Sequence, residues 1–373
     1  MGSRAELVLE IASEAGFDLA GIAPLAPPPA LPRFRSWLAA GRHADMEWLR
    51  ASAELIADPR SLLPEGRSLL VVGLGHARPA QVLPGGGRVA RYAAGRDYHN
   101  VVGRRLRRLA RRLAAAGLGG AWRKVVDAGP LLERSHASVA GLGFESKAAN
   151  LLHHRLGPWF FLGELLLEEE LEPSAGPAPG SCGTCTACLD ACPTSAILSP
   201  GVVDSRLCLS YHTIENRGSV PEELREAAGQ WAFGCDVCSE VCPFGARAPD
   251  KSAAFGTHPA LGRSLVDWLR HDPAQHAELF EGSALRRAQR SGLARNAALA
   301  LAAHPSEEGR QALRAALELD PSARVREAAG WALARAHGLD QGTAAALERA
   351  AAQEADPAAR ADLERSRERC GGG

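Results

Sequence analysis

The chain has 373 residues, which is more than one ordinary hydrophobic core accommodates, so the length predicts two or three domains. Lysine plus arginine and aspartate plus glutamate each number 43, and this balance excludes the strongly basic profile of a protein that binds nucleic acid over its whole surface. Glu6, Glu10 and Glu14 interrupt the first apolar stretch and no apolar run reaches the length of a membrane span, so we expect a cytoplasmic protein without membrane contact.

Residues 1–170 mix short strand-like runs with helical patterns. Ser68–Leu74 (SLLVVGL) and Trp159–Leu162 are candidates for buried strands. Ala5–Ala15 and Val101–Ala116 have apolar residues at helical spacing. These patterns predict an α+β domain over this part of the chain.

The second of these predicted helices carries a dense set of arginines. Leu106, Leu109 and Leu113 follow helical spacing and define its buried side. Guanidinium groups pair with phosphates and stack on bases, so the opposite side is either a nucleic-acid contact or a solvated surface. The arginines of this segment are Arg104, Arg105, Arg107, Arg108, Arg111 and Arg112.

A carboxylate stands where the next strand-like run ends. Asp127 follows Val125 and Val126 and precedes a Gly-Pro turn. Such a carboxylate is typical of an exposed cap, and a catalytic acid at a strand end has the same local pattern. The pattern alone leaves the role of Asp127 open.

Two cysteine runs follow a predicted linker, EPSAGPAPGS, at residues 172–181. In the first run, Cys182–Pro193, three cysteines stand three residues apart and a fourth precedes a proline, and the second run, Cys235–Pro243, has the same ending. In two-cluster ferredoxins the closely spaced thiolates bind one cluster, and the cysteine before the proline binds the other.

The spacing therefore predicts two 4Fe–4S clusters. The second run has Ala232 at the position three before Cys235, so Cys208 must supply that ligand from a separate loop. A structural zinc site needs only four sulfurs, and its pattern does not end in a cysteine directly before a proline. A disulfide framework is typical of short secreted chains. The expected ligands are Cys182, Cys185, Cys188 and Cys242 for one cluster and Cys192, Cys208, Cys235 and Cys238 for the other, with Cys370 left as a free thiol.

From about Ser264 the composition changes to alanine, leucine, arginine and glutamate in helical period. Ala294–Ala303, Gly309–Leu319 and Ser322–Ala336 predict successive short helices, and the last of them resembles a HEAT-type repeat. Such arrays present surfaces that bind macromolecules, although an extension that only supports the cluster domain fits the pattern too. A second group of arginines, Arg286, Arg287, Arg290 and Arg295, opens this region.

Several segments together resemble the epoxyqueuosine reductase family, in the same order and over nearly the whole chain. They are ARYAAGRDYH (90–99), VVDAGPLLER (125–134), AGLGFESKAANLL (140–152), WFFLGELLL (159–167), RLCLSYHTIE (206–215) and GCDVCSEVCPFG (234–245), besides the first cysteine run and the helical tail. The resemblance implies a cobalamin enzyme that receives single electrons from two clusters and reduces epoxyqueuosine to queuosine in tRNA, the final step of queuosine biosynthesis.

The same resemblance implies an α+β fold in three parts. An N-terminal α/β-sandwich-like cobalamin domain would span residues 1–170, a ferredoxin-like two-cluster domain residues 171–255, and HEAT-like helical repeats that contact the tRNA residues 256–369. The expected partners are a tRNA that carries epoxyqueuosine in its anticodon loop and a low-potential electron donor. We expect the protein to act as a monomer.

The resemblance also assigns roles to residues. Asp127 is the implied general acid for the departing epoxide oxygen, and burial beside the corrin should raise its pKa. The implied cofactor-binding residues are Arg91, Tyr92, Asp97, Tyr98, His99, Lys147, Asn150, Leu151, Ser210 and Tyr211. The implied tRNA contacts are Arg104, Arg107, Arg108, Arg286, Arg287 and Arg290.

The chain departs from the family pattern at two places. Glu145 stands in GFESK, where family members usually read Gly-Trp-Ile-Gly-Lys, and His212 replaces the leucine of the family's Ser-Tyr-Leu-Thr-Ile-Glu. His212, His153 and His154 are candidates for an axial cobalt ligand. We favour hydrogen-bonded or solvent-facing histidines, because none of the three lies in a cobalamin-ligating sequence context.

Two other functions share parts of this pattern. A corrinoid reductive dehalogenase uses the same cofactors, but such proteins usually carry a twin-arginine export signal and lack the helical tail. A non-catalytic electron-transfer protein whose repeats dock a partner would need no corrinoid, so cofactor analysis distinguishes it from the two enzymes.

Overall fold

The computed structural model describes residues 3–118 and 120–369, and Cys370, expected to be a free thiol, lies outside them. The chain divides into two compact units. Unit 1 comprises Met1–Pro79, Gly95–Arg206 and Asp236–Gly256, and unit 2 comprises Ala80–Ala94, Leu207–Cys235 and Thr257–Gly373. Each unit is assembled from separate stretches of sequence, whereas the three domains expected above are continuous, and their boundaries stay a prediction.

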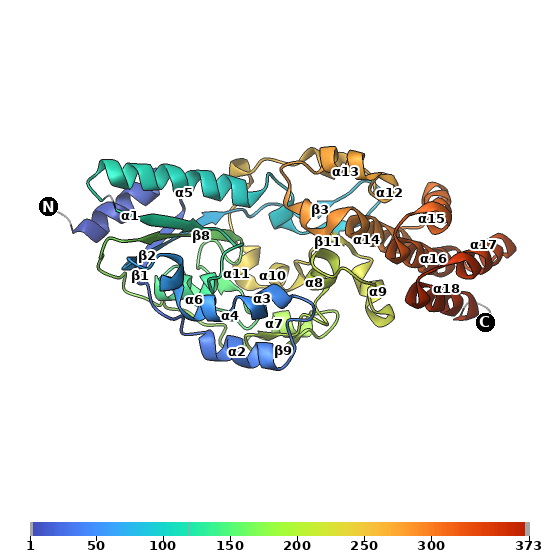
Figure 1. Cartoon of the computed structure of the whole chain (residues 1–373), viewed down its shortest axis with the longest axis horizontal. Helices are drawn as coiled ribbons and strands as arrows, with labels where there is room; N and C mark the ends of the chain where they lie inside the picture. The colour runs from blue at the N-terminus through green and yellow to red at the C-terminus, as the bar shows by residue number, and fades with distance from the viewer. Residues whose placement is uncertain (1–2, 119, 370–373) are drawn as a thin grey trace. The chain divides into compact units, whose positions relative to one another are not determined.

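An antiparallel four-stranded sheet forms the centre of unit 1 (Figure 1). In spatial order its strands are β1 (Leu19–Pro24), β2 (Ser68–Gly75), β8 (Phe160–Leu167) and β5 (Trp122–Val125). The strand expected at residues 68–74 is confirmed as β2, and the strand expected at 159–162 is the first part of β8. The architecture of this unit is mixed α/β.

Helices cover both faces of this sheet (Figure 1). α1 (Arg4–Glu14) and α5 (Tyr98–Ala115) pack on one face, and α6 (Glu133–Val139) packs on the other. Both helices predicted from apolar spacing are confirmed. Each begins at a side-chain cap that satisfies a free backbone amide, Ser3 for α1 and Asp97 for α5.

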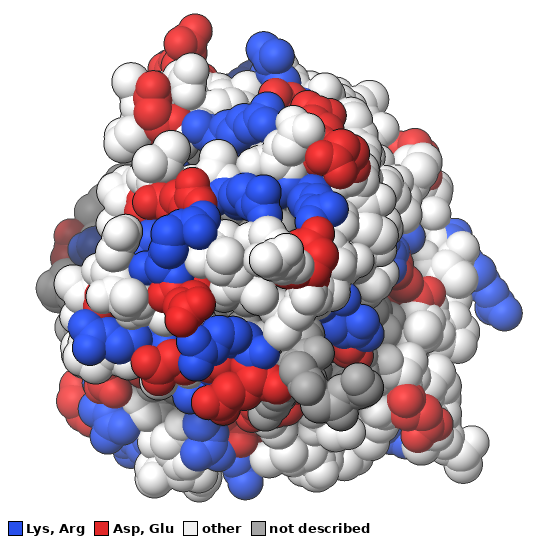
Figure 2. All heavy atoms as spheres, turned by 90° about the vertical axis from the view of Figure 1, so that its right-hand side faces the viewer, with Lys and Arg blue, Asp and Glu red and all other residues white. Residues whose placement is uncertain are grey.

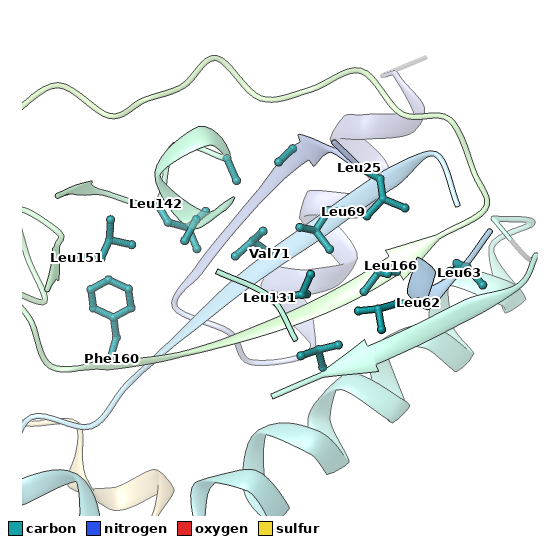
Figure 3. Packing of buried hydrophobic residues seen from close by; sticks show 14 of the residues in the cluster. Leu25, Leu62, Leu63, Leu69, Val71, Leu131, Leu142, Leu151, Phe160 and Leu166 are labelled. Atoms are coloured by element: carbon teal, nitrogen blue, oxygen red, sulfur yellow. The ribbon is translucent and has the colours of Figure 1, made fainter. Parts of the chain in front are cut away.

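The hydrophobic core of unit 1 shown in Figure 3 lies on the α6 side of the sheet. Leu69 and Val71 of β2 and Leu166 of β8 are fully buried there. Because side chains alternate along a strand, Glu164 points to the same face as Leu166. Its register partners are Val71 on β2 and Val125 on β5, so a carboxyl group lies within an otherwise apolar surface.

Short elements make up the rest of unit 1, including the part that carries most of the cysteines. Loops dominate there, because closely spaced ligands need tight turns rather than long ladders. These elements are α2 (Leu31–Ala39), α3 (Glu47–Ala51), α4 (Ala53–Ala57), η1 (Pro59–Leu62), β6 (Phe144–Glu145), β7 (Leu151–Leu152), α7 (Ala187–Asp190), β9 (Ile197–Ser199), β10 (Val202–Val203), α10 (Val237–Glu240), α11 (Pro243–Ala246) and η3 (Ser252–Ala254).

Unit 2 contains a short sheet and a succession of helices. β11 (Trp231–Phe233) pairs in parallel with β4 (Arg88–Val89), which pairs antiparallel with β3 (Gln81–Val82). The other elements are η2 (Arg91–Ala93), α8 (Leu209–Ile214), α9 (Glu222–Ala228), η4 (Pro259–Gly262), α12 (Leu265–Arg270), α13 (Pro273–Leu279), η5 (Ala284–Ala288), α14 (Gln289–Ala303), α15 (Glu307–Leu319), α16 (Ala323–His337), α17 (Gln341–Gln353) and α18 (Pro357–Arg369). Across the described stretches, 3–118 and 120–369, no helix is both long and apolar enough to cross a membrane.

The successive helices predicted after residue 290 are present as α14, α15 and α16. α14 is buried on nearly all sides, since every residue from Gly292 to Leu301 is inaccessible to solvent or nearly so. It packs against α16, α12 and β11. Its many alanines allow this close approach from several directions.

Arg295 of α14 is not part of a surface patch, and that expectation was wrong. The residue is 1% exposed, and its guanidinium donates to the carbonyl oxygens of His212, Asn216 and Gly218. A guanidinium carries five N–H donors, so one side chain can satisfy several carbonyls that end a helix and form a turn. Burial lowers the pKa of Arg295 to about 9. Arg295 therefore ties α14 to the end of α8.

Candidate active site and cysteine pocket

Asp127 lies directly after β5, in the loop that leads to α6. Its φ of 54° is in the left-handed region, which residues other than glycine rarely adopt. The backbone N–H of Asp127 donates to Glu133 Oε1 at 2.6 Å. A Cβ at Gly129 would lie 2.3 Å from Val125 Cγ1, so only glycine lets the loop fold back this tightly. The loop thus holds Asp127 in an unusual conformation through contacts on both sides.

Two consecutive residues at the start of α5, Tyr98 and His99, meet the Asp127 carboxyl group. The Tyr98 hydroxyl donates a hydrogen bond to Asp127 Oδ2, and His99 Nε2 lies 3.4 Å from the same oxygen. On its other side, His99 Nδ1 lies 2.8 Å from Asp97 Oδ1. The Tyr98 ring stacks on Phe161 of β8, with centroids 4.3 Å apart, which fixes its direction. Residues about thirty positions apart in sequence therefore form one constellation.

The charges of this constellation are strongly coupled. Burial alone would lower the pKa of His99, but hydrogen bonds and ionic attraction from Asp127 and Asp97 outweigh it and raise the pKa to about 9. Burial likewise opposes ionisation of Asp97, yet the hydrogen bonds from His99 lower its pKa. At neutral pH the imidazole is accordingly a cation that lies between the carboxyl groups of Asp97 and Asp127.

The Asp127 side chain is 58% exposed, so the chain itself does not bury it. The expectation that burial raises the pKa of Asp127 therefore finds no support in the surrounding protein atoms. Tyr98 and His99 place a hydroxyl group and a cation beside the Asp127 carboxyl group. The same exposure leaves the carboxyl oxygens accessible to a ligand.

Two carboxyl groups beneath this loop were missed in the sequence analysis. Glu133 begins α6 and is partly buried, and Glu164 of β8 is 0% exposed. Burial and the charge of Asp127 raise the pKa of Glu133 to about 7, and burial and Glu133 raise the pKa of Glu164 well above its ordinary value. The sequence feature that could have revealed Glu164 is its position as a charged residue within the apolar run FFLGELLL.

The four predicted ligands of the first cluster lie around one pocket of unit 1. Its empty volume is about 480 Å³, and Cys182, Cys185, Cys188 and Cys242 line it together with Cys238, Ser146, Asn150 and Phe244. Burial and the charges of Cys182, Cys242 and Cys185 raise the pKa of Cys188. Among the residues described, no three His, Cys, Asp or Glu side chains converge tightly enough for a single metal ion. Thiolates of a 4Fe–4S cluster each bind a different iron and stand farther apart.

Lys147 contacts the first cysteine loop. Its Nζ donates to the carbonyl oxygens of Gly183 at 2.8 Å and Cys185 at 3.0 Å, and its backbone N–H lies 3.5 Å from Cys182 Sγ. Asn150 Nδ2 donates to Ser239 Oγ at 3.2 Å. These contacts connect the GFESKAAN segment, expected to bind the cofactor, to the cysteine pocket.

Glu145 and Leu151 of the same segment pair in the short hairpin of β6 and β7. Glu145, one of the departures from the family pattern, forms an ion pair with Arg33 on the surface. Leu151 is 4% exposed and belongs to the core cluster of unit 1. The side chains of both residues are thus already engaged within the protein.

The remaining predicted ligands are divided between the units. Cys192 and Cys238 belong to unit 1, and Cys208 and Cys235 belong to unit 2. Cys192 Sγ accepts a hydrogen bond from the backbone N–H of Ala196 at 3.3 Å, as expected of a ligand sulfur.

The two other predicted groups of cofactor-binding residues lie in unit 2. Cys208 is the N-cap of α8, which carries the half-buried Ser210 and the buried Tyr211. Arg91 and Tyr92 lie in η2, where the Tyr92 ring is 6.1 Å from the ring of Phe233. Asp97, Tyr98 and His99, from the same sequence motif as Arg91, belong to unit 1.

The three histidines considered as cobalt ligands are all hydrogen-bonded, as we favoured. His212 is buried and its Nδ1 lies 3.1 Å from Asn216 Nδ2. His153 Nδ1 accepts hydrogen bonds from the following backbone, and His154 Nε2 lies 2.6 Å from the carbonyl oxygen of Pro179. Each ring thus has a local structural partner.

The arginines of α5 present a basic surface. Arg105 and Arg112 bend back to α1, where they bind the Gly16 carbonyl and the Glu14 carboxylate. The exposed members are Arg104, Arg107, Arg108 and Arg111.

The second group of arginines is largely occupied by structural contacts. Arg290 forms a two-pronged ion pair with Asp320 and is only 16% exposed, which places it in the fold rather than on a free surface. Arg287 is exposed, and its Nε lies 2.8 Å from Glu215. Arg286 is exposed as well.

The outer end of the C-terminal helices shows no continuous basic area (Figure 2). Lysine and arginine alternate there with aspartate and glutamate. Ion pairs between exposed side chains of unit 2 include Arg349 with Glu318 and Arg335 with Glu226. Phosphate binding to these arginines would compete with the ion pairs.

Comparison with known proteins reveals two matching family models. Residues 181–245 match the 4Fe-4S double cluster binding domain, which includes all cysteines assigned above to clusters. Residues 57–128 match the family described as Epoxyqueuosine reductase QueG, DUF1730, and this region ends one residue after Asp127.

Full-length relatives agree with these matches. The chain is 43% identical over 297 residues to the epoxyqueuosine reductase of Synechococcus sp. (strain CC9605), covering 78% of this chain and 92% of the relative. It is 39% identical over 341 residues to that of Xanthomonas campestris, covering 88% and 95%.

Solved structures are similar over almost their entire length. An epoxyqueuosine reductase in complex with an epoxyqueuosine-modified tRNA-Tyr stem loop is 27% identical, with a TM-score of 0.85 and 97% of both chains covered. The Bacillus subtilis epoxyqueuosine reductase, with its aspartate-containing catalytic loop swung out of the active site, is 27% identical, with a TM-score of 0.86 and coverage of 97% and 98%.

Proposed function

The chain belongs to the epoxyqueuosine reductase family, and we propose on this basis that it reduces epoxyqueuosine to queuosine in tRNA, with Asp127 as the proton donor. The single observation that supports this role best is the constellation around the Asp127 carboxyl group. An accessible carboxyl oxygen accepts a hydrogen bond from Tyr98 and lies 3.4 Å from a protonated imidazole. A general acid needs such a connection to a second proton source.

Removal of the epoxide oxygen as water requires electrons and protons in equal number. Reduced cobalamin, when bound, would supply these electrons to the strained epoxide ring. Asp127 would take a proton from the His99 imidazolium at Nε2 and pass it to the departing oxygen. Asp97 holds the opposite nitrogen of the ring and keeps the imidazole oriented toward Asp127.

The cysteine pocket is suited to the cluster chemistry that the family requires. We assign Cys182, Cys185, Cys188 and Cys242 to one 4Fe–4S cluster and Cys192, Cys208, Cys235 and Cys238 to the other. Thiolates arranged around a pocket of this size support the first assignment. A low-potential electron donor would reduce the clusters.

The residues proposed to hold cobalamin contribute in different ways. Tyr98 and His99 offer accessible polar groups beside Asp127. Lys147 and Leu151 already use their side chains inside the protein, so their contribution would come from the backbone. The remaining members of this set are Arg91, Tyr92, Asp97, Asn150, Ser210 and Tyr211.

We further propose that the tRNA contacts the exposed arginines of α5 and that α14 to α18 are HEAT-like repeats. The tandem arrangement of these helices and the Asp-Pro turn before α16 support the repeat assignment. Arg104, Arg107 and Arg108 support the tRNA contact because all three are exposed on one helix. Arg286 and Arg287 remain secondary candidates.

The decisive experiment is an anaerobic assay with epoxyqueuosine-containing tRNA, cobalamin and a low-potential reductant, read by nucleoside mass spectrometry. Asp127→Asn should retain both clusters and cobalamin, observed in the absorption spectrum, and should lose at least about 100-fold in turnover because no proton reaches the oxygen. Wild-type protein that forms no queuosine would refute the function. Normal turnover by Asp127→Asn would refute the role of Asp127 alone.

A further inference from the structure

Glu164 lies where a carboxyl group is least expected. It stands in the middle of β8 and is 0% exposed, and its carboxyl group interacts with the carboxyl group of Glu133. Its neighbours in register are valines, Val71 and Val125. An isolated carboxylate in such surroundings is strongly unfavourable, so Glu164 is held as the neutral acid.

Glu133 is the polar group that meets Glu164 from the helix above. α6 packs against β8, and Glu133 is its first residue. Burial and the charge of Asp127 raise the pKa of Glu133 to about 7, and burial and the charge of Glu133 raise the pKa of Glu164. Two adjacent buried carboxyl groups hold at least one proton between them at neutral pH.

The other charged groups around the pair are few. Asp127 acts on both carboxyl groups from the β5–α6 loop, and Arg134 acts on Glu133 from its own helix. β1 and β2, against which α6 also packs, have no charged residue, and Glu145 of β6, which packs against α6 as well, is paired with Arg33. On β5, Arg123 donates to the Leu62 carbonyl. The charge state of the pair therefore responds mainly to Asp127.

We propose that Glu133 and Glu164 are a positioning pair for Asp127, in which the buried Glu164 orients Glu133 and Glu133 fixes the backbone of Asp127. The contact that carries this inference is the 2.6 Å hydrogen bond from Asp127 N–H to Glu133 Oε1. The inference deepens the function proposed above and rests on it.

The contact matters because the conformation of Asp127 is unfavourable for a residue with a side chain. Its φ of 54° directs the carboxyl group toward Tyr98 and His99. Without an acceptor for its N–H, the loop would relax to an ordinary conformation and the carboxyl group would move away. Ionised Glu133 is the stronger acceptor, so the active arrangement should become more populated as pH rises through about 7.

Two pairs of variants test the proposal in the reconstituted holoenzyme with an epoxyqueuosine-containing stem loop. Glu133→Ala removes the acceptor and should lower the single-turnover rate about 100-fold, as misplacement of a catalytic group does, whereas Glu133→Gln keeps an acceptor oxygen and should lose far less. The rate of wild-type enzyme should rise through about pH 7, and Glu133→Gln should lack that step. A step that persists in Glu133→Gln would overturn the proposal.

Glu164→Gln and Glu164→Leu form the second, matched pair. Glutamine mimics the neutral acid and should retain most of the rate, while leucine fills the same apolar space without a donor and should reproduce much of the Glu133→Ala defect. Equal rates for the two would show that Glu164 is only a packing residue. If Glu164→Leu fails to fold, the comparison of Glu133→Ala with Glu133→Gln still tests the positioning role.

Hydrogen exchange separates this proposal from the proposed function. The amide of Asp127 should exchange about tenfold faster in Glu133→Ala than in wild type or Glu133→Gln, because one hydrogen bond is lost. This readout needs no turnover, so it supports or refutes the positioning role even if the wild-type enzyme were inactive on epoxyqueuosine. Unchanged exchange in Glu133→Ala would refute the positioning role.

Discussion

At the scale of single residues, the proposed proton transfer depends on contacts that share one carboxyl group. Asp127 accepts from Tyr98, lies beside His99 and is held through its backbone by Glu133. His99 in turn bridges Asp127 and Asp97. A change at any of these positions should therefore alter which groups of the site hold protons, and should leave the packing of the hydrophobic core intact.

His99→Gln should remove a pH dependence that the wild-type protein shows. The pKa of His99 is raised from 6.5 to about 9 in the folded protein, so its ion pairs contribute fully below about 6.5 and are lost as pH rises through about 9. Between pH 6 and pH 10, the thermal unfolding temperature of the wild-type protein should fall above pH 7. The unfolding temperature of His99→Gln should fall less over the same range. Identical pH dependence of the two proteins would contradict the pairing.

At the scale of elements, α5 has three separate functions. Its buried side packs against β8, its first turn supplies Tyr98 and His99, and its outer side carries the exposed arginines. Asp97 caps the helix and binds the ring of His99. The same helix thus carries the residues of the proposed proton relay and the exposed arginines.

Charge reversal of Arg104, Arg107 and Arg108 should weaken binding of the tRNA stem loop. Loss of up to three phosphate contacts should reduce the slope of log affinity against log salt by about 2, at roughly 0.7 per contact on a single strand. Filter binding across a salt series measures both quantities. Reversal of Arg349 and Arg335, which already pair with Glu318 and Glu226, is the matched control. An unchanged slope in the α5 variant would assign its arginines to the solvated surface.

At the scale of the whole molecule, each unit is held together by buried polar contacts between distant segments. In unit 2, Arg225 of α9 pairs with Glu327 of α16 and Asp362 of α18, and all three side chains are at most 7% exposed. Arg295 binds the carbonyl oxygens at the end of α8. The segment after Cys208 is therefore attached to the C-terminal helices by guanidinium groups as well as by packing.

Arg225→Met should destabilise the protein by about 3–5 kcal/mol, because it removes the buried cation that Glu327 and Asp362 share and leaves them only the Ser219 hydroxyl and the exposed Arg365. Arg335→Met, which breaks a pair with Glu226 whose side chains are 58% and 67% exposed, should cost only about 0–1 kcal/mol. Denaturant unfolding of both variants, monitored by circular dichroism, measures the difference. A similar loss in the free energy of unfolding for the two variants would show that burial does not determine how much each ion pair contributes to stability.

The sequence by itself determined the elements and the ligand chemistry. Apolar spacing located β2, α1, α5 and the helices from α14 to α16, because periodicity is a property of neighbouring residues. The cysteine spacing identified a double-cluster segment for the same reason. Asp127 was found through resemblance, since its local pattern also fits an ordinary cap.

Only the tertiary structure decided which charged side chains are exposed to solvent and which form ion pairs or hydrogen bonds inside the fold. Arg290 and Arg295 look like surface arginines in sequence, yet they lie in ion pairs and carbonyl contacts formed with residues far along the chain. Glu133 and Glu164 gave almost no sequence signal, because their importance comes from the pairing of α6 with β8 beneath Asp127. Burial and partnership depend on packing between distant segments, and that information is not contained in local spacing.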